Sequence, residues 1–509
     1  MNKDAQSETI EFLKELGSRA GDASPAMSTH ISRIFFAGDT VYKLKRAVRT
    51  AYLDFSTPQN RLAACKQELA LNRRTAPSLY RAVRRITKDA SGLSFDGPGE
   101  MVDAVVEMQR FDQDCLFDGL AQRGALTARH IESLAGRIAA LHRTASVSLQ
   151  QGGAKAIGLI LETNESELRQ SFLASERDLS SVCDKMRAAL STKSALIDAR
   201  RSAGKVRRCH GDLTLRNIAL IDGEPTPFDC LEFDETLSTI DVLYDLAFAL
   251  MDLWRKSRAD LANMLLNRYL DEADETDGLT LLPLFVAMRA IIRAHVAARM
   301  SDDAQGEKRM ELRAEAHAYV SLAEEAMCAG APVLVGVGGL SGSGKSTLAA
   351  ALAPLIAPIP GARVLSSDRI RKKLFGVAPT DRLPASAYTP DVSERVYSSA
   401  REGARLCLEA GWPVICDAVF DRAADRAALG RIAKECNAPF LGFWLEASGD
   451  VLAARVAART GDPSDATVEV LQAQQKKLAA SGESLDWIRL DASSPSSESA
   501  DRVRDKFLV

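Results

Sequence analysis

The sequence predicts a two-domain protein, with a bilobal α+β domain over residues 1–329 and an α/β domain built on a parallel sheet over residues 330–509. The first supporting observation is length, because 509 residues exceed what one ordinary domain holds. The second is that strand patterns dominate the start of the first part and helical patterns dominate its remainder. The third is that short apolar strands alternate with amphipathic helices after Pro332, as they do in βαβ units.

The first domain begins with a small lobe rich in β-structure. Alternating patterns at 32–36 and 40–45 flank a Gly38-Asp39 turn and predict a hairpin. A helical pattern at 57–75 and strand-like stretches at 83–86 and 102–108 complete this lobe. The rest is mainly helical, with predicted helices at 131–143, 165–175, 241–253, 284–300 and 309–328, a β-like insert at 206–233 and a polar loop at 301–308.

The second domain begins after Gly330, Ala331 and Pro332, which interrupt the helical pattern. A continuous apolar run at 333–337 predicts a buried strand. The Ser-rich stretch at 493–499 predicts a loop before a short final helix. The other predicted strands lie at 363–365, 414–416 and 440–445, and the predicted helices lie at 346–355, 393–410, 424–435 and 450–459.

Composition and charge exclude several classes of protein. A hydrophobic fraction of 46% and a charged fraction of 26% are ordinary for a globular chain, and a net charge of −3 gives no overall positive field for nucleic acid or acidic membranes. The nine cysteines include no CxxC pair, which favours reduced thiols. The N-terminus lacks the layout of a signal peptide, and no apolar run approaches the roughly eighteen residues that a membrane span needs. We therefore expect a soluble, cytoplasmic protein with no membrane partner.

A phosphate-binding motif follows the first strand of the second domain. Gly339 precedes Gly344-Lys345-Ser346 with the spacing of a P-loop, and a helical pattern follows at once. In such a loop backbone N–H groups turn towards the phosphates, the lysine reaches the β- and γ-phosphates, and the serine hydroxyl binds Mg²⁺. The predicted ATP-binding residues are Gly339, Ser341, Gly342, Ser343, Gly344, Lys345, Ser346 and Thr347, with Ser346 also a metal ligand.

Charged residues after later strands complete a candidate kinase site. Asp368 and Arg371 follow the second strand, where a carboxylate can take a proton from an acceptor hydroxyl and a guanidinium can hold a substrate or its phosphate. Asp417 ends the next strand at the ligand-facing edge of a parallel sheet and is a candidate metal ligand. Arg455 and Arg459 lie four apart on one helix face and fit a lid over the phosphoryl group, and a solvated helix face is the alternative.

These segments together resemble a known family. The P-loop, SDRIR at 367–371, CDAVF at 416–420 and RVAARTGDPSDA at 455–466 look like the P-loop kinases related to gluconate kinase, zeta toxins and polynucleotide 5′-kinases. The resemblance covers about residues 332–490 and implies the α/β fold of P-loop NTPases. By it, Asp368 is the base for the acceptor hydroxyl and Arg455 and Arg459 are lid arginines.

The β-like insert of the first domain carries a second set of candidate catalytic residues. His210-Gly211-Asp212 is followed by Asn217 and later by Asp229. This is the spacing of the protein-kinase catalytic loop, in which the first aspartate deprotonates the hydroxyl while the asparagine and a later aspartate hold Mg²⁺. Asp212 is therefore the predicted base, and Asn217 and Asp229 are the predicted metal ligands. A polar hairpin with an incidental aspartate is the alternative.

The insert resembles the aminoglycoside phosphotransferase family of small-molecule kinases, which implies a bilobal, protein-kinase-like fold. By that resemblance the N-terminal hairpin supplies a phosphate-binding lysine. Lys43 and Lys45 share one face of the strand, so either fits, and we favour Lys43. Glu68 on the following helix is the expected ion-pair partner, and Glu107 and Met108 are expected to form the hinge that pairs with adenine.

Two features depart from the protein-kinase pattern. The first strands lack a glycine-rich loop, and Asp229 stands in the sequence Phe-Asp-Cys-Leu-Glu rather than Asp-Phe-Gly. The resemblance also implies that Asp245 is a structural hydrogen-bonding residue. His142 lies among small and apolar helical residues and is expected to be a satisfied core histidine.

Together the two halves resemble bacterial proteins described as bifunctional aminoglycoside phosphotransferase/ATP-binding proteins. We therefore expect an ATP-dependent kinase with one ATP:Mg²⁺ site per domain, phosphorylating hydroxyl groups of small polar molecules. One alternative is that one domain is a nucleotide-sensing regulatory module. Aminoglycosides themselves are disfavoured as acceptors, because the acidic run at 270–277 is expected to be a solvated loop.

A second alternative is that the C-terminal domain phosphorylates a nucleic-acid or nucleotide-sugar acceptor. The basic residues Arg369, Arg371, Lys372 and Lys373 beside the acceptor site favour it. The near-neutral net charge and an aromatic content of 6% disfavour binding to nucleic acid.

Overall fold

The computed structural model describes residues 6–29, 31–49, 53–171, 176–459, 463–481, 485–493 and 496–507. The chain forms two compact units, one made of Met1–Ile160 and Ser194–Lys256 and the other of Leu161–Lys193 and Ser257–Val509. The predicted boundary between residues 329 and 330 falls inside the second unit and stays a prediction about the two sequence domains.

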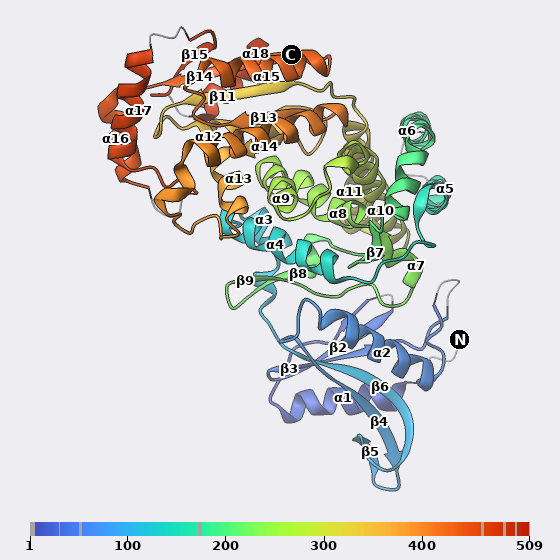
Figure 1. The fold of residues 1–509 in the computed structure, drawn as a ribbon. Helices are drawn as coiled ribbons and strands as arrows, with labels where there is room; N and C mark the ends of the chain where they lie inside the picture. The colour runs from blue at the N-terminus through green and yellow to red at the C-terminus, as the bar shows by residue number, and fades with distance from the viewer. Residues whose placement is uncertain are drawn as a thin grey trace. The chain divides into compact units, whose positions relative to one another are not determined.

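The first unit contains a six-stranded antiparallel sheet with the order β1-β2-β3-β6-β4-β5 (Figure 1, blue). The predicted hairpin is confirmed, because Phe35 pairs with Tyr42 and Ala37 with Thr40 across its turn. The strands are β1 (Met27–Ser28), β2 (Ser32–Ala37), β3 (Thr40–Lys45), β4 (Tyr80–Asp89), β5 (Gly92–Phe95) and β6 (Glu100–Gln109).

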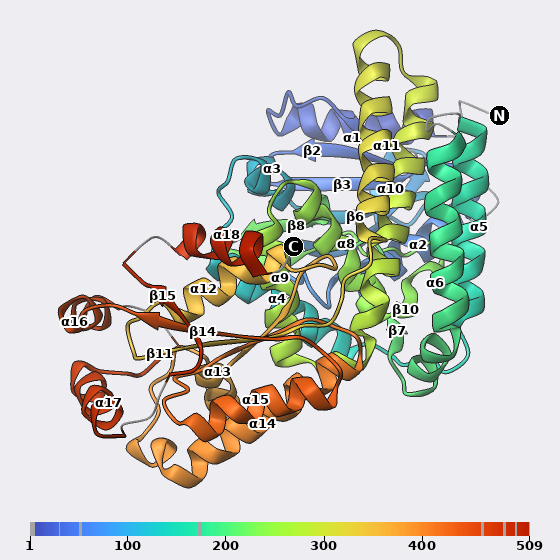
Figure 2. The same cartoon turned by 90° about the horizontal axis from the view of Figure 1, so that it is seen from above.

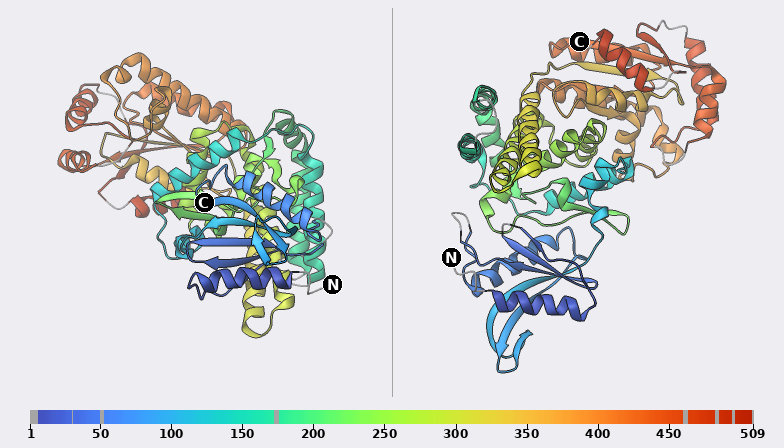
Figure 3. Two further views of the ribbon diagram at one scale, coloured as in Figure 1. Left: turned by 90° about the horizontal axis from the view of Figure 1, so that it is seen from below. Right: turned by 180° about the vertical axis from the view of Figure 1, so that it is seen from behind.

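Helices α1 (Ser7–Arg19) and α2 (Pro58–Asn72) pack on opposite faces of this sheet. Side chains alternate along a strand, so Val105 packs in one cluster with Leu13 of α1, whereas Val106 packs in another with residues of α2. The right-hand view of Figure 3 shows α1, in dark blue, lying along the sheet. The same alternation places Val41, and with it Lys43 and Lys45, on the face that α2 covers.

The rest of the first unit is helical around short strand pairs. Helix α8 is buried along nearly its whole length, as expected from its apolar sequence. Helices α5 and α6 each run from one unit into the other. The elements are α3 (Phe117–Gln122), α4 (Ala128–Thr144), α5 (Gly153–Ser171), α6 (Glu176–Ser202), α7 (Glu235–Ser238), α8 (Val242–Arg255), and the pairs β7 (Val206–Arg208) with β10 (Thr239–Asp241) and β8 (Ile218–Ile221) with β9 (Glu224–Pro227).

The second unit includes three long helices that follow α8 in the chain. They are α9 (Ala259–Glu272), α10 (Leu282–Asp303) and α11 (Gly306–Ala326), and α10 and α11 lie side by side (Figure 2). The predicted polar loop over 301–308 is wrong, because α10 continues to Asp303 and α11 begins at Gly306. The polar residues that suggested a loop instead lie mainly on exposed helix surface.

The expectation that no segment is apolar enough to cross a membrane also needs correction. Within the described residues, Thr276–Asp303 has the length and composition of such a span, with a mean hydropathy of 1.6 in its most apolar window. However, 72% of that window is buried inside the protein. Burial of this kind is typical of a core helix, whose apolar side chains face neighbouring helices.

The second unit also contains a five-stranded parallel sheet with the order β12-β13-β11-β14-β15. Helices α12 and α18 cover one face, and α14 and α15 cover the other (Figure 2). The strands are β11 (Leu334–Gly339), β12 (Arg363–Ser366), β13 (Val414–Asp417), β14 (Phe440–Glu446) and β15 (Ile488–Asp491), and the helices are α12 (Lys345–Leu352), α13 (Ser367–Leu374), α14 (Pro390–Glu409), α15 (Ala423–Glu435), α16 (Gly449–Ala457), α17 (Val468–Ser481) and α18 (Ser496–Phe507).

This strand order determines where a ligand can bind. Strand β11 lies between β13 and β14, so the chain reverses its direction of winding at β11. In open parallel sheets ligands bind beyond the carboxyl ends of the strands at such a point. The carboxyl ends of β11, β12 and β13 lead into the P-loop, into α13 and into Asp417.

Candidate active sites

The P-loop links β11 to α12 through glycines that other residues cannot replace. Gly344 caps α12 with φ of 88°, in the left-handed region that favours glycine. Gly339 has φ of 141°, and a Cβ there would lie 2.7 Å from the carbonyl oxygen of Leu445. The loop is held further by Gln474, whose Oε1 accepts a hydrogen bond from the Ser341 N–H at 3.0 Å.

Ser346 and Asp417 form the centre of the candidate metal site. The Ser346 hydroxyl donates to Asp417 Oδ2 at 2.6 Å. Asp417 is only 3% exposed, and burial raises its pKa to about 6, against the opposing effects of Lys345 and the Ser346 hydrogen bond. A hydroxyl and a carboxylate are the hard oxygen donors that Mg²⁺ prefers, so the residues present fit this ion.

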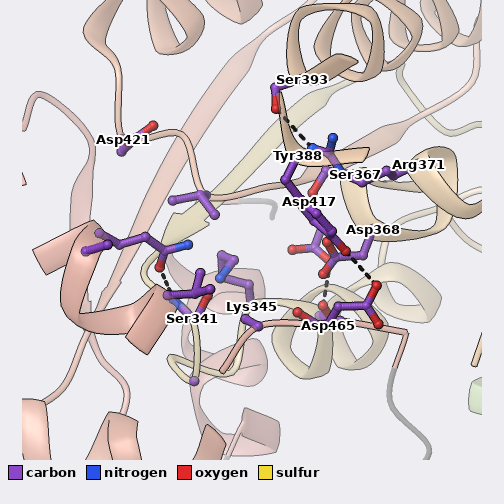
Figure 4. Close-up of a pocket in the computed structure, with 18 of the residues that line it drawn as sticks. Ser341, Lys345, Ser367, Asp368, Arg371, Tyr388, Ser393, Asp417, Asp421 and Asp465 are labelled. Carbon is purple, nitrogen blue, oxygen red and sulfur yellow. Dashed lines mark hydrogen bonds between the residues drawn. The ribbon is translucent and has the colours of Figure 1, made fainter. Parts of the chain in front are cut away.

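Asp368 and Arg371 lie one helical turn apart on α13, facing the P-loop. Figure 4 shows Lys345, Asp368 and Asp417 among the side chains that line one cavity. Arg371 is buried, donates to the carbonyl oxygen of Ala387 at 2.6 Å and lies 4.8 Å from the ring centre of Tyr388. This fixes the guanidinium in the cavity wall.

These groups surround a cavity of about 980 Å³ in the second unit. Both candidate lid arginines, Arg455 and Arg459, contribute to its wall. The expectation that they share one helix face is wrong, because α16 ends at Ala457 and Arg459 lies beyond it. Among the predicted residues, Gly339 and Ser343 are not part of the wall. The predicted residues that line it are Ser341, Gly342, Gly344, Lys345, Ser346, Thr347, Asp368, Arg371, Asp417, Arg455 and Arg459.

The sequence did not single out Asp465, which lies in the cavity wall as well. Its Oδ2 accepts hydrogen bonds from Lys372 Nζ at 2.6 Å, from the Tyr388 hydroxyl at 2.6 Å and from the Leu383 N–H at 3.0 Å. Burial opposes the charged form of Asp465, but the hydrogen bonds from Lys372, Tyr388 and the Leu383 N–H outweigh it and lower its pKa. The RVAARTGDPSDA segment contains both Asp462 and Asp465, and its spacing does not distinguish one from the other as a candidate site residue.

The basic cluster that favoured a nucleic-acid acceptor makes several contacts inside the protein. Arg371 and Lys372 are buried, and Lys372 bonds to Asp465. Arg369 pairs with Asp271, and Lys373 donates to the Asp271 carbonyl oxygen. Two of the four cations are thus paired with carboxylates, whereas Lys373 is exposed.

In the first unit, two lysines share one glutamate. Lys43 Nζ lies 2.7 Å from Glu68 Oε1, and Lys45 Nζ lies 2.6 Å from Glu68 Oε2. Lys43 also pairs with Asp229 at 2.5 Å, whereas Lys45 pairs with Glu232. The expected ion-pair partner is therefore in place for both lysines, and only Lys43 also contacts the candidate metal ligand.

The electrostatics of this cluster favour full ionisation of its main pairs. Burial opposes the charged forms, but Asp229 and Glu68 together raise the pKa of Lys43 well above its usual value. The two lysines in turn lower the pKa of Glu68 in spite of its burial, and Lys43 lowers that of Asp229. Glu232 differs, because burial raises its pKa against the opposing effect of Lys45. The sequence did not single out Glu232, whose partner Lys45 lies 187 residues away in the chain.

The candidate catalytic loop brings Asp212 and Asn217 together. Asn217 Nδ2 donates to Asp212 Oδ2 at 2.8 Å and to the Asp212 carbonyl oxygen at 2.9 Å. The amide oxygen of Asn217 and the carboxylate of Asp229 are oxygen ligands of the kind that Mg²⁺ takes, so this residue set also fits the ion. Asp229 has φ of 60°, which turns its side chain at a sharp bend of the chain.

Buried polar groups hold this loop from behind. Asp245 accepts hydrogen bonds from the N–H groups of His210 at 3.1 Å and Gly211 at 2.8 Å, which confirms its expected structural role. His142 Nε2 lies 3.0 Å from the same carboxylate, so His142 is a satisfied core histidine as expected. Cys209 lies within 4.8 Å of both, and these hydrogen bonds account for the cluster without a metal.

Glu107 and Met108 lie near the end of β6, which ends at Gln109. Their backbones are in register with β3 on one side and β4 on the other. The Glu107 carboxylate accepts from Arg84 Nε at 2.6 Å, and Met108 packs in the core under α2. The chain leaves the sheet only at Arg110, so backbone pairing of Glu107 and Met108 with adenine stays a prediction.

Comparisons with known proteins match both halves of the chain. Residues 36–280 match the family model described as "Phosphotransferase enzyme family", and residues 334–480 match the model described as "AAA domain". An uncharacterized protein of Mycobacterium tuberculosis is 31% identical over 483 residues, which cover 92% of each chain. An adenylyl-sulfate kinase of Myxococcus xanthus is 34% identical over 117 residues, which cover 23% of this chain and 59% of that enzyme.

The solved structure of a choline/ethanolamine kinase family protein from Mesorhizobium loti is 12% identical, with a TM-score of 0.37, and covers 63% of this chain and 99% of that one. The two matched families establish a kinase-like N-terminal fold and a C-terminal P-loop kinase-like fold, and they make the protein an enzyme of ATP-dependent phosphoryl transfer. The chain belongs to the same family as the Mycobacterium tuberculosis protein and joins a phosphotransferase-family domain to a P-loop kinase-like domain.

Proposed function

We propose that the protein has two separate kinase sites, one in each domain, and that each transfers the γ-phosphoryl group of ATP to a hydroxyl group of a small polar molecule. The observation that carries the proposal is that each domain brings its own full set of kinase-type residues to one place. The first set is Lys43, Glu68, Asp212, Asn217 and Asp229, and the second is Lys345, Ser346, Asp368, Arg371 and Asp417.

In the C-terminal site the P-loop backbone and Lys345 hold the phosphates. Ser346 and Asp417 would hold Mg²⁺, which when bound neutralises charge on the β- and γ-phosphates. Asp368 accepts the proton of the acceptor hydroxyl as the oxygen attacks the γ-phosphorus. Arg455 and Arg459, from the cavity wall, stabilise the negative charge on the transferring group.

In the N-terminal site Lys43 holds the phosphates and is itself positioned by Glu68. Asn217 and Asp229 would hold Mg²⁺ there, with the same effect on phosphate charge. Asp212 orients the acceptor hydroxyl and takes its proton, and the hydrogen bond from Asn217 fixes the carboxylate in place. Glu68 keeps Lys43 charged and extended towards the phosphates.

The intact residue sets favour two catalytic domains over one catalytic and one sensing domain. A domain that only sensed nucleotide would have no need of a base, and each domain has a candidate base, Asp212 beside Asn217 in one and Asp368 in the cavity wall of the other. For the C-terminal acceptor, a small molecule is favoured over nucleic acid because two of the adjacent cations, Arg369 and Lys372, are paired with carboxylates.

The test is ADP release by the full-length protein with ATP and Mg²⁺ against a library of sugars, sugar acids, amino alcohols, nucleosides and aminoglycosides. Asp212→Ala and Lys345→Ala are run beside the wild type. A substrate whose turnover is lost in only one variant belongs to the domain of that residue. If every turnover survives in both variants, the proposed sites are wrong.

A further inference from the structure

Helix α9 covers the open edge of the parallel sheet in the second unit. Strand β12 is the outermost strand on its side, so its outer backbone groups have no neighbouring strand. The Asn267 side chain takes that place, since its Oδ1 accepts from the Val364 N–H at 2.7 Å and its Nδ2 donates to the Ala362 carbonyl oxygen at 3.2 Å. Asn263 Nδ2 also donates to the Ala362 carbonyl oxygen, at 3.0 Å.

The last turn of α9 also contacts α13. Asp271 Oδ1 accepts from Arg363 Nη2 at 2.7 Å, and Asp271 Oδ2 accepts from Arg369 Nε at 2.8 Å. The carboxylate is 18% exposed, and Arg369 is 13% exposed. Figure 1 shows α9 beside α13. The acidic run at 270–277, expected to be a solvated loop, therefore begins with a residue bonded to two arginines of the C-terminal domain.

The strength of this contact has a clear electrostatic origin. Burial opposes the charged form of Asp271, but Arg363, Arg268 and Arg369 outweigh it and lower its pKa to about 2. The carboxylate is thus ionised at physiological pH. Hydrogen bonds between an ionised carboxylate and guanidinium groups are short and directional, and they fix the geometry of both partners.

The contact can affect catalysis because of where Arg369 lies in the chain. Arg369 follows Asp368 directly in the chain, at the start of a helix of eight residues. Holding the Arg369 side chain on α9 therefore sets the rotation of α13 about its axis, and with it the direction in which Asp368 faces the cavity. Misplacing a catalytic group by about 1 Å can cost on the order of a hundredfold in rate.

We propose that Asp271 is a positioning residue of the C-terminal kinase site, acting through Arg369 on Asp368. The match to the phosphotransferase family, residues 36–280, includes α9, whereas the match to the P-loop domain begins at residue 334. A helix that the sequence assigns to the first domain is thus a structural part of the second active site. The proposal rests on the proposed function, because it needs Asp368 to act in phosphoryl transfer.

The experiment uses the full-length chain with Asp212→Ala, so that the remaining turnover of ATP is that of the C-terminal site. Asp271→Asn, Arg369→Gln and the double variant are compared with Asp260→Asn. Asp260 lies on the same helix, but its carboxylate pairs with Arg258 at the opposite end, which makes it a matched control. The readouts are ADP release with ATP and Mg²⁺ in the presence of the acceptor found by the screen, or in water alone, and amide hydrogen exchange of residues 367–374.

Both single variants are expected to lower kcat about 10- to 100-fold and to leave KM for ATP within about twofold, because the P-loop is untouched. The double variant is expected to be no worse than either single one, since both act through one contact. Exchange at 367–374 is expected to become faster in these variants and to stay at the wild-type rate in Asp260→Asn.

Unchanged kcat and unchanged exchange in Asp271→Asn overturn the proposal. So does an equal effect in Asp260→Asn, or a fall in kcat that comes with an equal loss of ATP affinity, because either shows general destabilisation. If no turnover is found that Lys345→Ala removes, it is instead the proposed function that fails. In that case the exchange at 367–374 still decides whether Asp271 holds α13.

Discussion

Ser346 at the start of α12 donates a hydrogen bond of 2.6 Å to Asp417 at the end of β13. Strands β11 and β13 are adjacent and parallel, and Val337 pairs with Asp417, so the sheet itself brings the P-loop and this carboxylate together. Residues 71 positions apart in the chain thus form one hydrogen-bonded pair, which we propose as the metal site. The first prediction concerns this pair.

Binding of Mg²⁺ and nucleotide to the C-terminal site is expected to weaken below about pH 6. The pKa of Asp417 is raised to about 6, and binding needs the ionised form, so affinity is full above pH 7 and falls about tenfold for each pH unit below 6. Asp417→Asn is expected to bind weakly at every pH. Calorimetry with a non-hydrolysable ATP analogue and Mg²⁺, on a Lys43→Met background, measures this.

The same titration with EDTA in place of Mg²⁺ is its control. Nucleotide affinity should then be low in both proteins and should lack the step near pH 6. A wild-type affinity that stays constant from pH 8 to pH 5 contradicts the assignment of Asp417 as a metal ligand.

Lys43 and Lys45 are predicted to have different roles, with Lys43 needed for turnover and Lys45 for stability. Lys43→Met is expected to reduce turnover at the N-terminal site by about 100-fold or more, because it removes the cation that faces the phosphates. Lys45 is fully buried between Glu68 and Glu232, so Lys45→Met leaves the buried Glu232 without its cation and leaves Glu68 paired with Lys43 alone. It is expected to lower the free energy of unfolding by about 3–5 kcal/mol.

Urea unfolding followed by tryptophan fluorescence, together with ADP release, separates the two effects. The double variant Lys45→Met with Glu232→Gln should recover part of the stability that Lys45→Met loses. Equal stabilities for Lys43→Met and Lys45→Met, or normal turnover in Lys43→Met, argue against this division of roles.

The stability conferred by Asp271 is expected to be independent of pH above about 4. Its folded-state pKa of about 2 lies below the ordinary value of 3.8, so its contribution is present above the unfolded-state pKa and is lost only as the pH falls towards 2. Asp271→Asn should lower the free energy of unfolding by roughly 2 kcal/mol at pH 7 and at pH 5 alike. Urea titrations of the wild type and Asp271→Asn at both pH values test this. A difference in unfolding free energy that is present at pH 7 and absent at pH 5 refutes it.

Trp487 is expected to make Gly442 irreplaceable. A Cβ at Gly442 would lie 2.5 Å from the Trp487 ring, and one at Gly336 would lie 2.6 Å from it. Gly442→Ala should destabilise the protein by about 1–3 kcal/mol through overpacking. Gly136 on α4 has open space around it, and Gly136→Ala, the matched control, should be neutral or stabilising by up to about 1 kcal/mol. Thermal unfolding of both variants gives the comparison, and a neutral Gly442→Ala contradicts the packing argument.

The sequence alone predicts those parts of the candidate sites that are local in the chain. The P-loop and the loop from His210 to Asn217 are short segments in which spacing alone specifies the chemistry. Glu232, Asp465 and Asp271 escaped because their partners are far away, at separations of 187, 93 and 98 residues. No pattern within one segment reports contacts of that kind.

The secondary-structure elements that the sequence predicted wrongly have similar physical causes. Strand β15 was missed because it is short and mostly exposed, which removes the apolar alternation that marks a half-buried strand. The residues before Gly306 are polar, and this suggested a loop. Most of them are helical, because the part of a helix that faces solvent needs no apolar stripe. In both cases the structure depends on neighbours that the local sequence does not encode.

The central claim is that the chain carries two ATP sites, and the most direct test is the stoichiometry of nucleotide binding. Equilibrium dialysis of the full-length protein with a non-hydrolysable ATP analogue and Mg²⁺ is expected to give two nucleotides bound per chain. Lys345→Ala and Lys43→Met should each give one, and the double variant none. One nucleotide bound per wild-type chain, lost in only one of the two variants, would contradict the account.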